Sequence, residues 1–266
     1  MTILRSILIF CTTALVASAT FAAPPDSLPQ GATGLVATVI DGDTVRLKDG
    51  SADIRLVGTQ APKLPLGRKG FKTWPLAEDS KNALSALVQD RAVTLRLGTA
   101  PLDRNGRTLA HLVRDDGLWV QGEMLRIGFA HVYTFPDNRK LAAEMFVLEA
   151  QARAAQRGIW AHPFYAVRDA TSPKLMDDVG TFQIVSGTVR SVAPTKDRTY
   201  INFGDDFRSD FTASIEKRDL ARFKDAKLNL SALKDRLIEV RGWLTARNGP
   251  MIEVTHPEQI FLSASK

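Results

Sequence analysis

One carboxylate and two guanidinium groups, spread over three short segments, are the residue types that phosphate chemistry needs. Asp43 ends the segment Asp41-Gly42-Asp43. Arg55 lies in an apolar run, and Arg107 follows an Asn-Gly step. A carboxylate binds a hard cation through its oxygens, and an arginine presents a planar fork that matches two phosphate oxygens. A fold that gathers these three side chains would hold a phosphate group and its metal ion.

Each of these residues also has an ordinary structural interpretation. Asp and Gly are favoured in tight turns, and an arginine on a strand is commonly a solvated surface residue. The joint spacing of Asp43, Arg55 and Arg107 favours a site over these separate interpretations.

Strand-like runs and turn signals alternate along the segments around these residues, as expected for a β-rich domain. Asp49-Gly50 and Asn105-Gly106 predict turns between strands. The expected strands are 36–40, 44–47, 52–57, 92–97 and 108–113. The expected helices are 75–90, 120–130 and 140–157. We therefore predict an α+β domain over residues 34–165, with a five-stranded β-barrel and three helices.

The rest of the chain has a different character. Residues 166–179 show little periodicity and are interpreted as a linker. Within residues 180–262, the expected strands are 182–192, 199–203, 211–215, 237–245 and 251–254, with a helix at 216–224. A helix after the third of five strands is an OB-fold pattern, so we predict a second, mostly β, OB-like barrel.

Aromatic and arginine side chains fall on or beside the second and third strands of this barrel. Tyr200, together with Arg198 and Arg208, would combine base stacking with phosphate contacts. Alternating aromatic residues also fill barrel cores, so this alternative stays open. We select Arg198, Tyr200 and Arg208 as candidate nucleic-acid-binding residues.

The amino terminus has the composition of a cleavable signal peptide. Arg5 precedes an apolar run over residues 7–17, and small residues follow. We expect removal of residues 1–23, a lead-in at 24–33, and a periplasmic or secreted protein; an uncleaved anchor is the alternative. The single cysteine of the chain, Cys11, lies in this segment, so cysteine catalysis and cysteine metal sites are excluded after cleavage. The net charge of +6 favours polyanionic partners but is also ordinary for a soluble protein.

Several motifs of the first domain resemble the staphylococcal nuclease (thermonuclease) family over roughly residues 33–165. They are Val39-Ile40-Asp41-Gly42-Asp43-Thr44-Val45, Ile54-Arg55-Leu56-Val57-Gly58, Gly106-Arg107-Thr108-Leu109-Ala110, Asn138-Arg139 and Gly158-Ile159-Trp160. The resemblance implies an OB-type barrel and calcium-assisted hydrolysis of DNA and RNA phosphodiesters. It makes Asp43 a metal-binding aspartate and makes Arg55 and Arg107 the phosphate-clamping arginines. Tyr133 and Phe135 resemble positions that pack against a nucleotide base, with core packing as the alternative.

The chain departs from the family pattern at two positions. Gln60 stands where the family carries its second metal-ligating aspartate, and Lys63 stands where it carries the glutamate base. An amide binds calcium more weakly than a carboxylate does, and an ammonium has no lone pair with which to accept a proton from water. We therefore expect a phosphate-binding pocket of Arg55, Arg107 and Lys63, a weakened Ca²⁺ site on Asp43 and Gln60, and nuclease activity that is weak or lost.

Two other functions stay open. A working DNA or RNA nuclease would need an altered metal or base, which a lowered pKa of Lys63 beside Arg55 and Arg107 would provide. Glu78, Asp79 and Asp103 are candidate substitute carboxylates. The other alternative is an envelope interaction module that recognises protein or glycan. Nucleic acid or another phosphate polyanion is the partner expected for the first two functions.

Overall fold

The computed structural model describes residues 25–262, so the predicted signal peptide lies outside the described residues. Five strands of the N-terminal part close into a barrel in the order β1-β2-β3-β6-β5. Their bounds are β1 (Gln30–Asp41), β2 (Thr44–Leu47), β3 (Ile54–Leu56), β5 (Ala92–Leu102) and β6 (Thr108–Arg114). The pair β3–β6 is parallel, and the other four pairs are antiparallel. We call this unit the N-terminal barrel.

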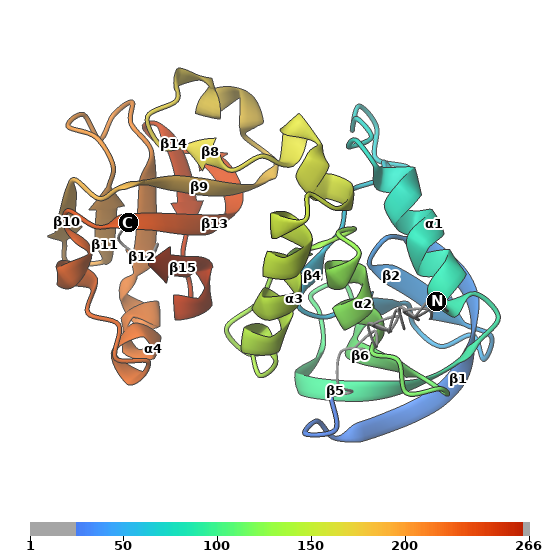
Figure 1. Cartoon of the computed structure of the whole chain (residues 1–266). Coiled ribbons are helices and arrows are strands. Elements are labelled where there is room, and N and C mark those ends of the chain that lie inside the picture. The colour runs from blue at the N-terminus through green and yellow to red at the C-terminus, as the bar shows by residue number, and fades with distance from the viewer. Residues whose placement is uncertain (1–24, 263–266) are drawn as a thin grey trace, which may run out of the picture.

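Three helices pack around the N-terminal barrel (Figure 1). They are α1 (Ala77–Val88), α2 (Val120–Arg126) and α3 (Ala142–Ala154), each shorter than the sequence predicted. The chain leaves α2 at Gly128, which has a φ of 80° that favours glycine. The two-residue strands β4 (Thr59–Gln60) and β7 (His131–Val132) pair beside the barrel. These elements confirm the predicted α+β class.

Residues 168–262 form a second sheet, which we call the C-terminal sheet. Its strands are β8 (Arg168–Asp169), β9 (Phe182–Thr188), β10 (Ser191–Pro194), β11 (Arg198–Asn202), β12 (Thr212–Glu216), β13 (Leu237–Ala246), β14 (Pro250–Glu253) and β15 (Ile260–Leu262). They follow the order β10-β11-β12-β14-β13-β9-β8, with β15 also pairing with β13. Helix α4 (Leu220–Asp225) lies between β12 and β13 in the sequence.

Two details of this region differ from the sequence predictions. The strand expected at 182–192 is divided into β9 and β10. The expected linker, 166–179, contains β8, which pairs with β9, and Leu175, which is buried in the core of the C-terminal sheet. This segment is therefore part of the packed sheet and not a free connection, because its few apolar side chains find partners that no local pattern reveals.

Short 3₁₀ helices complete the secondary structure. They are η1 (Gly158–Ala161), η2 (Pro163–Tyr165), η3 (Pro173–Asp178), η4 (Lys217–Asp219), η5 (Leu230–Leu233) and η6 (Pro257–Gln259). No helix between residues 25 and 262 is both long enough and apolar enough to cross a membrane.

The barrel and the C-terminal sheet meet along α3 and β13 (Figure 1). Arg241 of β13 and Glu149 of α3 form an ion pair of 2.8 Å, and both side chains are only 5% exposed. An apolar cluster joins Trp74 and Tyr165 with Phe182 of the sheet. Burial of charge and apolar surface makes this a packed interface between the two units.

Candidate phosphate site

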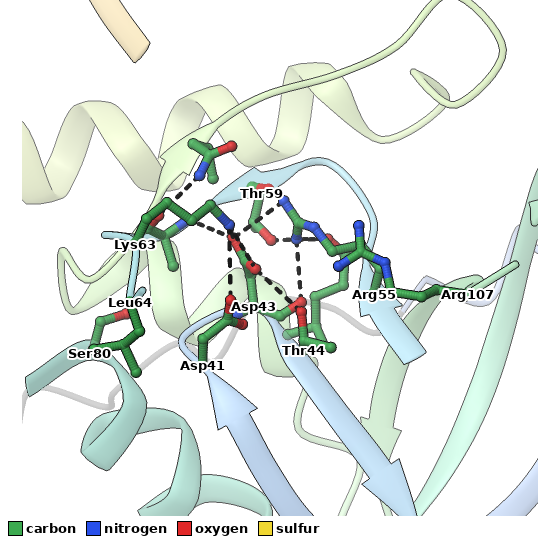
Figure 2. Close-up of polar contacts among 12 residues, drawn as sticks. Asp41, Asp43, Thr44, Arg55, Thr59, Lys63, Leu64, Ser80 and Arg107 are labelled. Carbon is green, nitrogen blue, oxygen red and sulfur yellow. Dashed lines mark hydrogen bonds and ion pairs between the residues drawn. The ribbon is translucent and has the colours of Figure 1, made fainter. Parts of the chain in front are cut away.

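The turn between β1 and β2 places Asp43 at the centre of a buried polar cluster (Figure 2). The side chain is fully buried. Its Oδ2 accepts the backbone N–H of Ala61 at 2.8 Å. The ammonium of Lys63 lies 3.0 Å from Oδ1 and 2.8 Å from Oδ2. Nη2 of Arg55 lies 3.1 Å from Oδ2. Three donors of the protein therefore already surround this carboxylate.

Arg55 is held by backbone carbonyls as well as by Asp43. Its Nη1 donates to the carbonyl of Leu56 at 2.8 Å and to that of Asp43 at 3.2 Å. Its Nη2 donates to the carbonyl of Thr59 at 2.5 Å. A guanidinium has five N–H groups, and the four on Nη1 and Nη2 face these protein oxygens. In this arrangement Arg55 supplies a fixed positive charge rather than an open fork for two phosphate oxygens.

Lys63 reaches the cluster from the segment after β4. Its side chain is 15% exposed, and its Nζ lies 4.0 Å from Oδ2 of Asp41. The carbonyl of Lys63 accepts the backbone N–H of Trp74 at 3.0 Å, which fixes this segment against the chain that leads into α1. Lys63 therefore holds a defined position between two aspartates.

The electrostatics of the cluster follow from burial and from its cations. Burial alone would raise the pKa of Asp43, but the charges of Arg55 and Lys63 hold that pKa below its ordinary value. Burial lowers the pKa of Lys63, and Asp43 opposes this shift. Burial also raises the pKa of Asp41, with Asp43 adding to the effect. Asp43 is consequently the more acidic of the two carboxyls.

Gln60 does not complete a cation site with Asp43. Its side chain is buried, and its amide nitrogen donates to the carbonyl of Ala61 at 2.9 Å. Among residues 25–262, no group of three or more His, Cys, Asp or Glu side chains is arranged to hold a metal ion. Calcium would have to displace Lys63 from Asp43 and accept Arg55 as a neighbour, so the residues present do not fit it.

Arg107 approaches the cluster from the hairpin between β5 and β6. Figure 2 shows its side chain extending toward Arg55. Its Nε and Nη2 both lie 2.7 Å from Oδ2 of Asp103, and its side chain is 33% exposed. Asp103, a candidate substitute carboxylate, is therefore engaged with Arg107. Arg107 is more accessible to a ligand than Arg55.

The aromatic pair Tyr133 and Phe135 follows β7. Their ring centroids are 4.7 Å apart, and Tyr133 also lies edge-on to Phe182 at 5.1 Å. The backbone N–H of Tyr133 donates to the carbonyl of Gly58 at 2.8 Å, so this segment runs beside the residues that follow Arg55. Tyr133 is half-buried, whereas Phe135 is 43% exposed and remains free to contact a ligand.

The three candidates of the C-terminal sheet lie apart from this cluster. The guanidinium of Arg198 pairs with Glu216 and lies 3.6 Å from Glu253, so its charge is compensated within the sheet. Tyr200 is half-buried on β11. Arg208 is exposed, with its guanidinium 5.3 Å from the ring centroid of Phe207.

Sequence reasoning missed three contributors to the site. The turn pattern of Asp41-Gly42-Asp43 does not predict that Asp41 faces Lys63, although its position two residues before Asp43 is a signal for it. The carbonyl of Thr59 and the N–H of Ala61 are backbone groups that side-chain patterns do not reveal. The Thr59 carbonyl fixes Arg55, and the Ala61 N–H fixes Asp43.

Comparison with known proteins assigns relatives to about half of the chain. A family model described as staphylococcal nuclease homologue matches residues 53–162. An uncharacterized endonuclease of Escherichia coli is 32% identical over 129 residues, or 48% of this chain and 76% of that protein. A thermonuclease of Staphylococcus intermedius is 28% identical over 138 residues, or 49% of this chain and 77% of its own. Endonuclease YhcR of Bacillus subtilis (strain 168) is 28% identical over 136 residues, or 48% of this chain and 11% of that protein.

Proposed function

The chain belongs to the staphylococcal nuclease homologue family, and from this premise we propose that it binds nucleic-acid phosphodiesters in a pocket of Arg55, Arg107 and Lys63. Calcium-dependent hydrolysis in this pocket is weak or lost. The observation that carries the proposal is the contact of the Lys63 ammonium with both carboxylate oxygens of Asp43, at 2.8 and 3.0 Å.

The charges of the pocket support anion binding without a metal. Asp43 faces two cations, Arg55 and Lys63, and burial raises the pKa of the neighbouring Asp41, which favours its neutral form, so the inner cluster tends toward an excess of positive charge. Arg107 adds a further guanidinium that is shared with Asp103. A phosphate group is attracted by this excess charge and accepts hydrogen bonds from Arg107 and Lys63. Arg55 acts on the phosphate through its fixed charge.

A second candidate function is hydrolysis with Lys63 as the base. Burial lowers the pKa of Lys63, and a neutral amine accepts a proton from water. The ion pair with Asp43 works against this function, because it stabilises the protonated form. Binding with feeble hydrolysis is therefore the function that the geometry supports better.

The test is binding and cleavage of labelled DNA and RNA oligonucleotides by the mature protein, with EDTA or with one divalent metal at a time. We expect binding that survives EDTA and weakens in Arg107→Ala, with cleavage no greater than that of Arg107→Ala. The double variant Gln60→Asp with Lys63→Glu should gain calcium-dependent cleavage, because it restores carboxylates at both positions. Efficient calcium-dependent digestion by the wild type would contradict the proposal.

The remaining parts of the proposal concern location and architecture. We infer export to the periplasm or the medium from residues 1–23, and the mass of the mature protein recovered outside the cytoplasm tests this. We also infer a division into a domain at 34–165 and a second OB-type barrel at 180–262. Two observations support the second barrel. If β9 and β10 count as one strand, the strand order β10-β11-β12-β14-β13-β9 matches that of the N-terminal barrel. The pair β12–β14 is parallel, as is the pair β3–β6.

A further inference from the structure

The outer face of the C-terminal sheet carries a cavity that the phosphate site does not use. Ile201 of β11 points into the core, so Tyr200 and Asn202 lie on the opposite face. Tyr200 faces Ala193 of β10 and Ser214 of β12. This cavity, the outer groove, has a volume of about 280 Å³, and its lining includes Tyr200, Asn202, Phe207, Thr212, Arg247 and Met251.

Phe207 is presented to this groove by a well-fixed loop, residues 204–211. Asp210 accepts the N–H of Asp206 at 2.8 Å, and Asp206 accepts the N–H of Arg208 at 3.0 Å. The turn between β13 and β14 packs so closely that a Cβ at Gly249 would lie 2.7 Å from the carbonyl oxygen of Asp210. The acidic side chains of the loop thus fix its backbone by accepting hydrogen bonds from it. The side chain of Phe207 remains 56% exposed.

The chemistry of the outer groove fits a flat ring next to an anion. Tyr200 and Phe207 offer aromatic surface, and the same cavity is lined by Asn202 and Thr212, whose hydroxyl donates to the Asn202 amide oxygen at 3.3 Å. Arg208 and Arg247 are exposed cations at the loop and at the turn. The nearby Asp205 is paired with Arg190 at 2.7 Å, which reduces its repulsion of an anion.

We propose that the outer groove binds a base of single-stranded nucleic acid by stacking on Tyr200 and Phe207, with Arg208 and Arg247 contacting the flanking phosphates. A single strand is required because the faces of duplex bases are covered by their neighbours. The proposal rests on the proposed function, since it makes nucleic acid the shared ligand of both units.

The position of the groove adds a dependence on strand length. Strands β10 and β11 lie at the edge of the C-terminal sheet that is remote from the N-terminal barrel (Figure 1). A short oligonucleotide therefore occupies one site at a time, whereas a long single strand contacts both and gains affinity from the linkage.

The experiment measures the affinity of the full-length mature protein, in EDTA, for a labelled single strand of about 30 nucleotides and for the same sequence as a duplex. Phe207→Ala should weaken single-strand binding about tenfold and leave duplex binding unchanged. Met176→Ala is the control, because Met176 is a 47% exposed apolar side chain outside the groove. Arg107→Ala should weaken binding of both forms if the proposed function holds.

A second readout locates the base directly. Photo-crosslinking of a strand that carries 5-iodouracil should give cross-linked peptides that contain Tyr200 or Phe207. Unchanged single-strand affinity in Phe207→Ala, or cross-links confined to the N-terminal barrel, would contradict base binding in the outer groove. Neither result would contradict the proposed function. Binding of a cell-wall oligosaccharide that depends on Phe207, without such dependence for the oligonucleotide, would also overturn it. Weaker oligonucleotide binding in Phe207→Ala, without any change in Arg107→Ala, would instead contradict the proposed phosphate pocket.

Discussion

Asp43 stabilises the fold as well as the site, because it is the ionised partner of two largely buried cations. Its Oδ2 lies 3.1 Å from Arg55 and 2.8 Å from Lys63. Asp43→Asn leaves both cations without their shared counter-charge, so we expect a loss of about 3 kcal/mol in the free energy of unfolding. Urea titration followed by circular dichroism measures this loss.

Asp53→Asn provides the matched control for this substitution. Asp53 pairs with Arg46 at 2.7 Å, but the side chain of Arg46 is 53% exposed. Solvent screens such a pair, so the expected loss is below about 1 kcal/mol. Equal losses in the two variants would show that Asp43 makes no special contribution.

The acid sensitivity of the fold depends on the same residue. The pKa of Asp43 is lowered because Arg55 and Lys63 outweigh the effect of burial. A carboxyl with a lowered folded pKa contributes stability above its unfolded pKa, near 4, and that contribution is lost as pH falls. The wild type should therefore lose more unfolding free energy between about pH 7 and about pH 3 than Asp43→Asn. Parallel pH profiles would contradict this expectation.

The site was predictable from the sequence where residue type alone determined its role. Spacing and resemblance pointed to Asp43, Arg55 and Lys63, which share one cluster in the structure. The three backbone carbonyls that hold Arg55 were not predictable, because they come from the turn after β1, from the end of β3 and from β4. Backbone partners depend on tertiary arrangement, which side-chain patterns do not encode.

At the scale of elements, strands with regular alternation and turn signals were predictable, and very short ones were not. The strands of the N-terminal barrel follow the expected order along the chain, with different ends. The two-residue strands β4 and β7 have too few residues to show a period. The structure of segment 166–179 is hidden for the same reason, since β8 also spans two residues.

The pair of α3 and β13 gives a prediction at this scale. Arg241 contacts Glu149 at 2.8 Å and donates to the carbonyl of Val132 at 3.1 Å, while Glu149 accepts the N–H of Val132 at 2.7 Å. Arg241→Met leaves a buried carboxylate unpaired, so we expect a loss of about 4 kcal/mol in unfolding free energy. Urea titration checks this.

Arg153→Met is the control for Arg241→Met. Arg153 joins the same helix to β13 through Glu239 at 2.8 Å, but its side chain is 37% exposed. Water replaces a partner there, so the expected loss is about 1 kcal/mol or less. A loss for Arg241→Met no larger than that of Arg153→Met would mean that the interface tolerates a buried charge.

Over the whole molecule, the C-terminal sheet supports the surroundings of the phosphate site. Trp243 of β13 packs on Trp74 with ring centroids 5.7 Å apart. The backbone N–H of Trp74 donates a hydrogen bond to the carbonyl of Lys63. Phe182 packs on Tyr133, and Thr134 is hydrogen-bonded to His256 at 2.7 Å. The segments that carry Lys63 and Tyr133 therefore rest on residues from the other unit.

This dependence predicts that the two units unfold together. Their interface buries an ion pair and an apolar cluster, so one unit cannot unfold without exposing the other's buried surface. Tryptophan fluorescence reports Trp74, Trp160 and Trp243 of the interface cluster together with Trp119 of the N-terminal unit, and far-ultraviolet circular dichroism reports both sheets. The two signals should give coincident urea transitions in the wild type. In Arg241→Met the fluorescence transition should move to lower urea than the circular dichroism midpoint, because the interface then opens first. Two separate transitions in the wild type would show that the units are independent and that the sheet does not hold the Lys63 segment.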